Sequence, residues 1–257
     1  MNNNIFFILC HQDDEFGLFN VIEKATKKQK NVFVIYLTSG LKTKNQNNKN
    51  KLLQRDKESL KVLLRLGVSR NNIFFLGKKL NVPVYNLYKN LKIVYQEINK
   101  FLKKHQGKHI IYTHSWEGGN EDHDACFVIV KKIMYQNLKI MKAFEFSHYH
   151  NYKTQILPFK VQNFIYDKKK IYRTKIKFYD KIKYINYLFN YISQLYLWLP
   201  IFPFVVIRIL MNDYGNLKMI KKNLIIEKPH EGILLYEKLR TKKYAYFKKY
   251  FLNFLSN

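Results

Sequence analysis

Five short apolar runs alternate with longer amphipathic segments over the first 146 residues of this chain. Short apolar runs bounded by polar or glycine-containing turns are typical of buried strands, and apolar residues at helical spacing between them predict helices. The predicted strands are Ile5–Leu9, Asn31–Leu37, Ile73–Leu76, His109–Thr113 and Ala143–Phe146. The predicted helices are Phe16–Lys28, Leu52–Leu66, Leu87–Leu102 and Asp124–Tyr135. This alternation predicts an α/β fold with a mostly parallel sheet and helices on both faces.

The chain is long enough for one domain with a full core. We expect residues 1–150 to form the α/β core and residues 151–257 to complete the same domain as a helical extension. Within the extension, Tyr184–Ile207 has no charged residue over 24 consecutive positions. That length could span a membrane, but Pro200 and Pro203 interrupt it. Three interpretations stay open: a membrane-spanning helix, an interfacial or groove-lining helix pair in 184–210, and an ordinary buried helix. We favour the buried helix.

Lysine and arginine outnumber aspartate and glutamate by 46 to 18, which gives a formal net charge of +28. Such a charge favours acidic partners such as nucleic acid, anionic lipid or anionic sugars. The basic residues are spread along the whole chain without a nucleic-acid-binding motif, so we expect no nucleic-acid partner. Weak peripheral association with an anionic membrane is retained. The sequence predicts no oligomeric state.

The two cysteines, Cys10 and Cys126, do not form a disulfide framework. We expect both side chains in the core and the protein in a reducing cytoplasm. The N-terminus lacks the basic region of a signal peptide, so none is predicted.

Side chains that can bind a metal follow the first predicted strand. His11, Asp13 and Asp14 lie there, and histidine nitrogens and carboxylate oxygens are good zinc ligands. In parallel sheets the ligand site lies beyond the carboxyl ends of the strands. His11, the segment 38–40 and His114 each follow a predicted strand, so we expect them at one edge.

A further ligand is expected from the acidic, glycine-containing segment 116–123. His123 stands at the start of a predicted helix, and the adjacent Asp122 can orient it. This segment and the first motif together hold six of the 18 acidic residues of the chain. Lys42–Lys51, a predicted solvated loop, lies at the same edge and could close over the site as a lid.

Two motifs resemble those of the LmbE/PIG-L-like N-deacetylases. His11-Gln12-Asp13-Asp14-Glu15 is similar to the His-Pro-Asp-Asp-Glu signature of that family, and residues 113–125 are similar to a second motif with the core Gly-Gly-His-Pro-Asp-His. Arg55 and Glu58 before Leu66-Gly67 resemble an Arg-x-x-Glu helix of the family. Weaker similarities lie at Tyr191-Ile192-Ser193-Gln194 and at Pro229-His230-Glu231-Gly232 with Tyr236-Glu237.

The resemblance implies a Rossmann-like deacetylase with zinc, or another divalent metal, held by His11, Asp14 and His123. Asp13 would be the general base toward a metal-activated water that attacks the acetamide carbon. Arg55, Glu58 and His230 would contact the sugar, and Trp116 either stacks on it or packs the loop. The implied products are acetate and a free amino sugar, and the N-acetylated substrate could be linked to a nucleotide or to a lipid.

Two residues depart from the family pattern. Gln12 replaces a proline, which is expected to change only loop stiffness. Asn120 replaces a histidine that stabilises the oxyanion or donates a proton, and an amide cannot supply a proton. Either the Asn120 amide suffices for this role, or His114, His150 or His230 replaces the missing histidine, or the activity is reduced.

Glu15 is expected to support the site without reacting, and His148 and His150 are expected at its rim or on the surface. Three alternatives remain: an amidohydrolase acting on a thiol–sugar conjugate, a binding member without activity, and a membrane-associated protein of glycan assembly.

Overall fold

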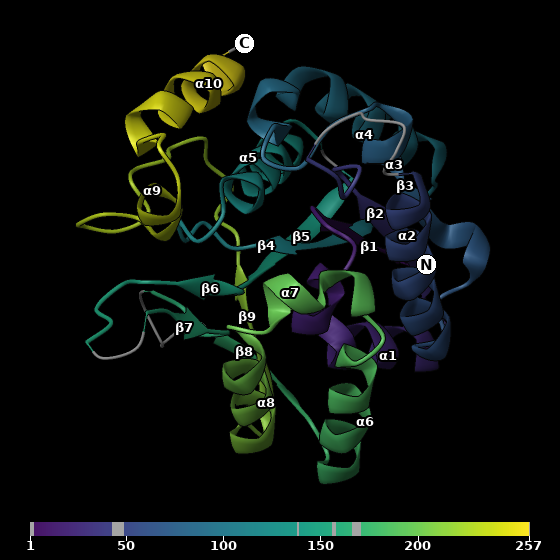
Figure 1. Ribbon diagram of the computed structural model, residues 1–257. Coiled ribbons are helices and arrows are strands. Elements are labelled where there is room, and N and C mark those ends of the chain that lie inside the picture. Colours follow the sequence, from purple (N-terminus) through teal and green to yellow (C-terminus); the bar gives the residue numbers. More distant parts are fainter. Residues whose placement is uncertain (1–2, 43–48, 138, 156–157, 166–170, 257) are drawn as a thin grey trace.

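The computed structural model describes residues 3–42, 49–137, 139–155, 158–165 and 171–256. Its central feature is a seven-stranded sheet in the order β3-β2-β1-β4-β5-β9-β8 (Figure 1). The first five strands in the chain run parallel, whereas β9 is antiparallel to both β5 and β8. The strands are β1 Asn4–Leu9, β2 Asn31–Tyr36, β3 Ile73–Phe75, β4 His109–His114, β5 Ile140–Phe146, β8 Ile171–Lys175 and β9 Tyr214–Met219. The predicted mostly parallel α/β sheet is therefore confirmed.

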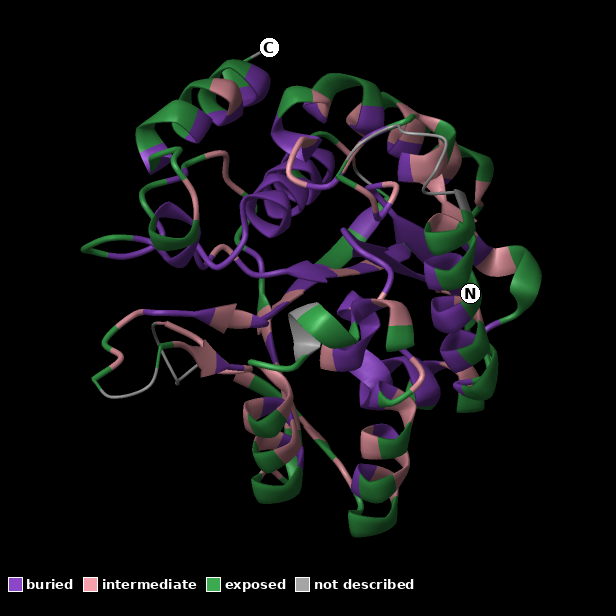
Figure 2. Ribbon diagram, in the orientation of Figure 1, coloured by how far each residue is buried: buried purple, intermediate pink, exposed green. Residues whose placement is uncertain are grey.

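Helices cover both faces of this sheet, as predicted. Phe6 and Ile8 of β1 point into one core, and Phe7 and Leu9 point into the other, because successive side chains of a strand face opposite ways. The first core packs against α4 Leu91–Lys104, α5 Glu121–Gln136 and α10 Tyr244–Ser256. The second packs against α1 Phe19–Lys27, α2 Lys49–Arg65, α6 Phe178–Leu188 and α8 Phe202–Met211. Figure 2 shows the buried strands between these two layers.

The part of the chain after Phe146 adds strands that we did not predict. β8 and β9 lie at one edge of the sheet, and most of their residues are at least partly exposed. They therefore lack the continuous apolar run that identifies a buried strand. A separate two-stranded ladder joins β6 Tyr149–His150 to β7 Lys160–Val161. The C-terminal part is thus not wholly helical.

The remaining short elements are η1 Asp14–Leu18, η3 Arg70–Asn72, α3 Leu76–Lys79, η4 Leu87–Lys89, η6 Ile192–Gln194, α7 Leu195–Trp198 and α9 Leu235–Leu239.

Several helix boundaries differ from the prediction. α5 begins three residues earlier than predicted because Asn120 caps it, its Oδ1 accepting a hydrogen bond of 2.9 Å from the Asp122 N–H. The end of the predicted Lys42–Lys51 loop already belongs to α2, and residues 43–48 of that loop lie outside the described residues.

The uncharged segment 184–207 does not form one helix. It runs through the end of α6, then η6 and α7, and into α8, which carries a proline in its first turn. Tyr184 and Val205 are buried, but Ile192 and Leu199 are exposed, so the interpretation as an ordinary buried helix is wrong for the middle of the segment. Among the described helices, none has the length and apolar character needed to cross a bilayer.

Candidate metal centre

The carboxyl ends of β1, β2 and β4 meet at one point, as predicted. The Cys10 N–H donates to His114 Nε2 at 3.2 Å, and the Thr38 hydroxyl donates to the Cys10 carbonyl at 2.8 Å. These bonds join the residues that directly follow or end the three strands. Both predicted core cysteines, Cys10 and Cys126, are fully buried there.

Four buried side chains converge just beyond these strand ends. Asp14, His114, His123 and His148 each offer one ligand atom, and these atoms all lie within 4.8 Å of one another. The Asp14 carboxylate is at the centre, with Oδ2 3.0 Å from His114 Nε2 and Oδ1 3.2 Å from His123 Nε2. His148 Nε2 is farther away, 4.0 Å from Oδ1. The sequence placed His148 at the rim or surface, and the structure instead buries it in this cluster.

His11 lies beside the cluster. Its Nδ1 is 3.5 Å from Asp14 Oδ2, and its ring centroid is 5.3 Å from that of His123. Its Nε2 lies 3.1 Å from Asp122 Oδ2. We expected Asp122 to orient the adjacent His123, but its carboxylate contacts His11 instead, since α5 turns the two neighbouring side chains in different directions.

The histidine nitrogens fit a metal ion. Both ring nitrogens of His123 and Nε2 of His148 are buried and have no hydrogen bond within the described part of the chain. Buried polar atoms nearly always have a partner, so orphaned nitrogens beside a buried carboxylate indicate a ligand. Nitrogen and carboxylate donors suit zinc and, with less preference, other divalent transition metals.

The electrostatics of the cluster agree with such a site. Burial opposes ionisation of Asp14, but the electrostatic interactions with His114, His123 and His11 outweigh it and hold the pKa of Asp14 well below its usual range. Burial lowers the pKa of His114 to about 3, and also lowers the pKa of His148 well below its usual range. Asp14 therefore carries its charge while these two histidines stay neutral, which is the state of metal ligands.

Asp13 is not one of the four clustered residues, and its neighbours hold it in place. Its N–H donates to Glu15 Oε2 at 3.1 Å, and its Oδ1 lies 3.4 Å from Arg55 Nη2. Arg55 in turn donates from Nη1 to the Gly40 carbonyl at 2.5 Å. The Asp13 side chain keeps 18% of its surface exposed, compared with 6% for Asp14, so it is the aspartate of the motif that solvent reaches.

Glu15 joins the first motif to α2 and to the segment before η6 through buried hydrogen bonds. Its Oε1 accepts hydrogen bonds from the Ser59 hydroxyl at 2.5 Å and from the Tyr191 hydroxyl at 2.8 Å. Burial raises the pKa of Glu15 to about 7. Glu58 similarly accepts from the N–H of Ser193 at 2.9 Å and from its hydroxyl at 2.5 Å. The carboxylate of Glu58 is thus occupied by η6, which weighs against its predicted contact with a sugar.

Gln12 does more than change loop stiffness. Its side-chain amide donates to Asp56 Oδ1 at 3.0 Å, and Asp56 also accepts from the Lys78 amine at 2.7 Å. The motif is thereby joined to α2 and α3 through a buried side chain that a proline could not replace.

Asn120 has the position of the family histidine but a different set of contacts. Its Oδ1 is used in capping α5, and its Nδ2 donates to the Tyr149 hydroxyl at 3.4 Å. Gly119 lets this loop approach β6, since a Cβ there would lie 1.9 Å from the Tyr149 carbonyl oxygen. No sequence pattern singled out Tyr149, although it lies three residues after β5, at the ligand edge.

The other predicted site residues do not join the cluster. The Trp116 ring packs near Phe127 and Phe251, and its N–H donates to the Glu227 carbonyl at 2.7 Å, so it packs the loop. His150 Nε2 is bonded to the Asn163 carbonyl at 2.6 Å, and its Nδ1 accepts from the Tyr152 N–H. His230 lies against Tyr152.

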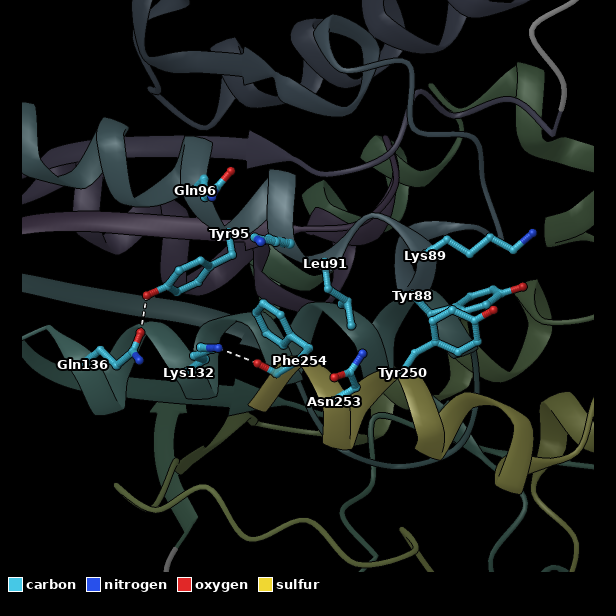
Figure 3. A pocket seen from close by; sticks show the side chains of 11 residues that line it. Tyr88, Lys89, Leu91, Tyr95, Gln96, Lys132, Gln136, Tyr250, Asn253 and Phe254 are labelled. Carbon is cyan, nitrogen blue, oxygen red and sulfur yellow. Dashed lines mark hydrogen bonds between the residues drawn. The ribbon is translucent and has the colours of Figure 1, made fainter. Parts of the chain in front are cut away.

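A hollow of about 740 Å³ lies elsewhere, between η4, α4, α5 and α10 (Figure 3). Tyrosines and lysines line it, but none of the residues of the metal centre does. Its buried amine, Lys132, already donates to the Phe254 carbonyl, so the hollow does not contribute to the chemistry of the cluster.

Comparisons with known proteins agree with this geometry. The family model PIG-L, described as GlcNAc-PI de-N-acetylase, matches residues 6–134. An N,N'-diacetylchitobiose deacetylase from Pyrococcus horikoshii has a similar structure, with a TM-score of 0.60 and 15% identity over 85% of this chain and 84% of that one. A deacetylase of teicoplanin biosynthesis, in complex with bog, gives a TM-score of 0.60 and 13% identity over 84% and 97% of the two chains. Among curated proteins, none matches.

Proposed function

This chain belongs to the PIG-L family, and from that premise we propose that it is a metal-dependent hydrolase that removes the acetyl group from an N-acetylated amino sugar of the GlcNAc type. The observation that carries the proposal is the buried Asp14 carboxylate beside His123 and His148, where both ring nitrogens of His123 and Nε2 of His148 lack a hydrogen-bond partner among the described residues. Water and the acetamide would give acetate and a free amine, so no further reactant is required.

Asp14, His123 and His11 would hold the metal, with His148 next to them. His114 would support Asp14 from the other side, because its Nε2 already accepts the Cys10 N–H. We favour zinc because of the nitrogen-rich donor set. When bound, the ion would lower the pKa of a water molecule and stabilise negative charge on the acetamide oxygen. The chain's own part is to keep Asp14 ionised and His148 neutral, which the charges and burial of the cluster already do. Burial opposes the charged form of His11, but Asp14 and Asp122 raise its pKa well above its usual range, so His11 would release a proton on binding the ion.

Asp13 would act as the general base. It is partly exposed beside the cluster, and Arg55 and Glu15 fix its carboxylate and its backbone. Asp13 would take a proton from the attacking water and return it to the leaving amine. Because Asn120 can donate a hydrogen bond but no proton, proton transfer would depend on Asp13, and the Asn120 amide would at most stabilise the developing oxyanion.

The substrate class is supported by the family and by the named sugar deacetylases of similar fold. We propose that the buried Arg55, which lies 3.4 Å from Asp13, contacts the sugar or an anionic substituent, and that the sugar is linked to a nucleotide or a lipid. A cytoplasmic location is part of the proposal, supported by two buried cysteines that form no disulfide.

A second candidate is a metal-binding family member with impaired activity. Asn120 favours this alternative, because its oxygen is used as a helix cap and it supplies no proton. Metal analysis combined with acetate release from N-acetylglucosamine and its lipid- and nucleotide-linked forms separates the two. One metal ion per chain with acetate release supports the enzyme, whereas metal without release on this panel supports the binding protein. Absence of metal after purification in added zinc contradicts both.

A further inference from the structure

Five large apolar side chains between α6 and α8 are mostly exposed to solvent. They are exposed by 60% at Phe189, 65% at Ile192, 55% at Leu195, 94% at Tyr196 and 68% at Leu199. We call this group the α7 surface. A cluster of exposed apolar residues of this size usually marks an interaction site, whereas single exposed apolar residues do not.

One edge of the α7 surface is cationic. α2 contacts η6, and its Arg65 lies 3.4 Å from the Asn190 side-chain oxygen. Lys57, Lys61 and Arg65 are all exposed and have no ion-pair partner within the described part of the chain. The acids of α2 do not offset them, because Asp56 and Glu58 are buried and bonded to Lys78 and Ser193.

The α7 surface is also connected to the catalytic motif. Tyr191 and Ser193, which flank Ile192, hydrogen-bond Glu15 and Glu58, and Glu15 accepts from the Asp13 N–H. Figure 1 shows α7 in front of the sheet, near the start of α1 and thus near the first motif. A partner bound to this surface would lie close to Asp13.

The chemistry of the surface selects the partner. Apolar side chains next to unpaired lysine and arginine suit the interface of an anionic bilayer, where the apolar groups enter the headgroup region and the cations meet lipid phosphates. A second copy of this chain is disfavoured, since two molecules each with a formal charge of +28 repel one another. No described helix could anchor the chain by spanning the membrane, so the contact would be peripheral.

We infer that the α7 surface and the cationic edge of α2 dock the protein on an anionic lipid bilayer, with Asp13 facing substrate in the membrane surface. Docking itself is independent of catalysis. Its consequence, preference for a lipid-linked N-acetylated sugar, rests on the proposed function.

The test is co-sedimentation of the full chain with vesicles of equal parts phosphatidylglycerol and phosphatidylcholine. We expect binding to these vesicles, much weaker binding to pure phosphatidylcholine, and partial release in high salt. The triple variant Leu195→Ser, Tyr196→Ser, Leu199→Ser should bind at least about tenfold more weakly, because three apolar side chains no longer enter the interface. The double variant Lys57→Glu, Lys61→Glu should weaken binding to anionic vesicles only.

Matched controls carry the same chemical changes elsewhere. Ile225, Ile233 and Leu239 are exposed by 71%, 54% and 69%, so their triple serine variant changes three exposed apolar side chains away from α7. Lys248→Glu with Lys249→Glu makes the same charge change on α10. Both controls should bind vesicles like the parent chain.

Activity separates docking from catalysis. The α7 triple variant should hydrolyse water-soluble N-acetylglucosamine as fast as the parent and lose activity only on the lipid-linked sugar in vesicles. The inference fails if the parent does not sediment with anionic vesicles, or if the α7 triple variant sediments as the parent does. The inference also fails if the parent chain is a dimer and the α7 triple variant is a monomer, because the α7 surface would then be a dimer interface. Vesicle binding without any hydrolysis would contradict the proposed function alone.

Discussion

His11 Nε2 lies 3.1 Å from Asp122 Oδ2, although the two residues are separated by 111 positions in the chain. The same carboxylate accepts hydrogen bonds from the backbone N–H groups of Tyr85 at 2.5 Å and Leu87 at 3.1 Å. Asp122 therefore joins the motif after β1 to the start of α5 and to the segment before α4. Because Asp122 contacts Nε2 of His11, Nδ1 of the same ring lies on the side of Asp14.

Asp122→Ala should weaken metal binding through His11. Loss of a carboxylate that orients a ligand histidine typically costs about 10- to 100-fold in metal affinity. Two backbone N–H groups also lose their acceptor, so the free energy of unfolding should fall by about 1–3 kcal/mol. Zinc affinity by chelator competition and urea unfolding check both effects. A folded Asp122→Ala variant with the zinc affinity of the parent would exclude this role of Asp122.

The distances of His123 and His148 from Asp14 predict different roles for these two histidines. His123 Nε2 is 3.2 Å from the Asp14 carboxylate, whereas His148 Nε2 is 4.0 Å away. We expect His123→Ala to remove stoichiometric metal binding and His148→Ala to weaken it by about tenfold, as for a supporting residue. Metal content and zinc affinity of the two variants provide the measurement. Equal losses would make His148 a ligand of the same rank as His123.

Asp13→Asn should retain the metal and lose turnover. The amide keeps the shape of the side chain but cannot accept the proton of the attacking water, and such proton transfer contributes about 10²- to 10⁴-fold to rates. The comparison is kcat for acetate release together with metal content. Glu231→Gln, the same chemical change at an exposed residue, is the control and should behave like the parent. Retained turnover in Asp13→Asn would assign the base elsewhere.

The parallel half of the fold could be predicted because its strands are buried on both faces. Ile5–Leu9 and Asn31–Leu37 are continuous apolar runs for that reason, and the turns after them end at the ligand edge. β8 and β9 could not be predicted in this way, since these half-exposed strands mix polar and apolar residues.

The candidate site was predictable where residues follow a strand end or match a family motif. His11, Asp13 and Asp14 follow one strand, and His123 begins a helix beside it. The place of His148 depends on how the chain turns after β5, where Glu117 accepts hydrogen bonds from the N–H groups of His148 and Tyr149. The partner of Asp122 likewise depends on the relative position of β1 and α5, which no local pattern specifies.

Gly119→Ala should destabilise the loop that carries Asn120. The added Cβ would lie 1.9 Å from the Tyr149 carbonyl oxygen, so the loop or β6 must move, and such overpacking costs about 1–3 kcal/mol. Gly232→Ala is the control, because a Cβ there meets nothing within 4 Å and only its positive φ of 78° opposes the change. Thermal unfolding should show the larger loss for Gly119→Ala, and a larger loss for Gly232→Ala would contradict the close approach.

Glu145→Gln should change how stability depends on pH. Burial raises the pKa of Glu145 from 4.5 to about 7, against the opposing charges of Lys218 and Lys131. The folded state thus holds this proton more tightly than the unfolded state, so ionised Glu145 costs stability above pH 7, and the cost disappears as the pH falls below 4.5. Glu145 is partly exposed, so we expect Glu145→Gln to be more stable than the parent by about 1 kcal/mol at pH 8 and equal to it near pH 4. Urea unfolding of both proteins across this range measures the difference, and a difference that does not change with pH would show that Glu145 has an ordinary pKa in the folded protein.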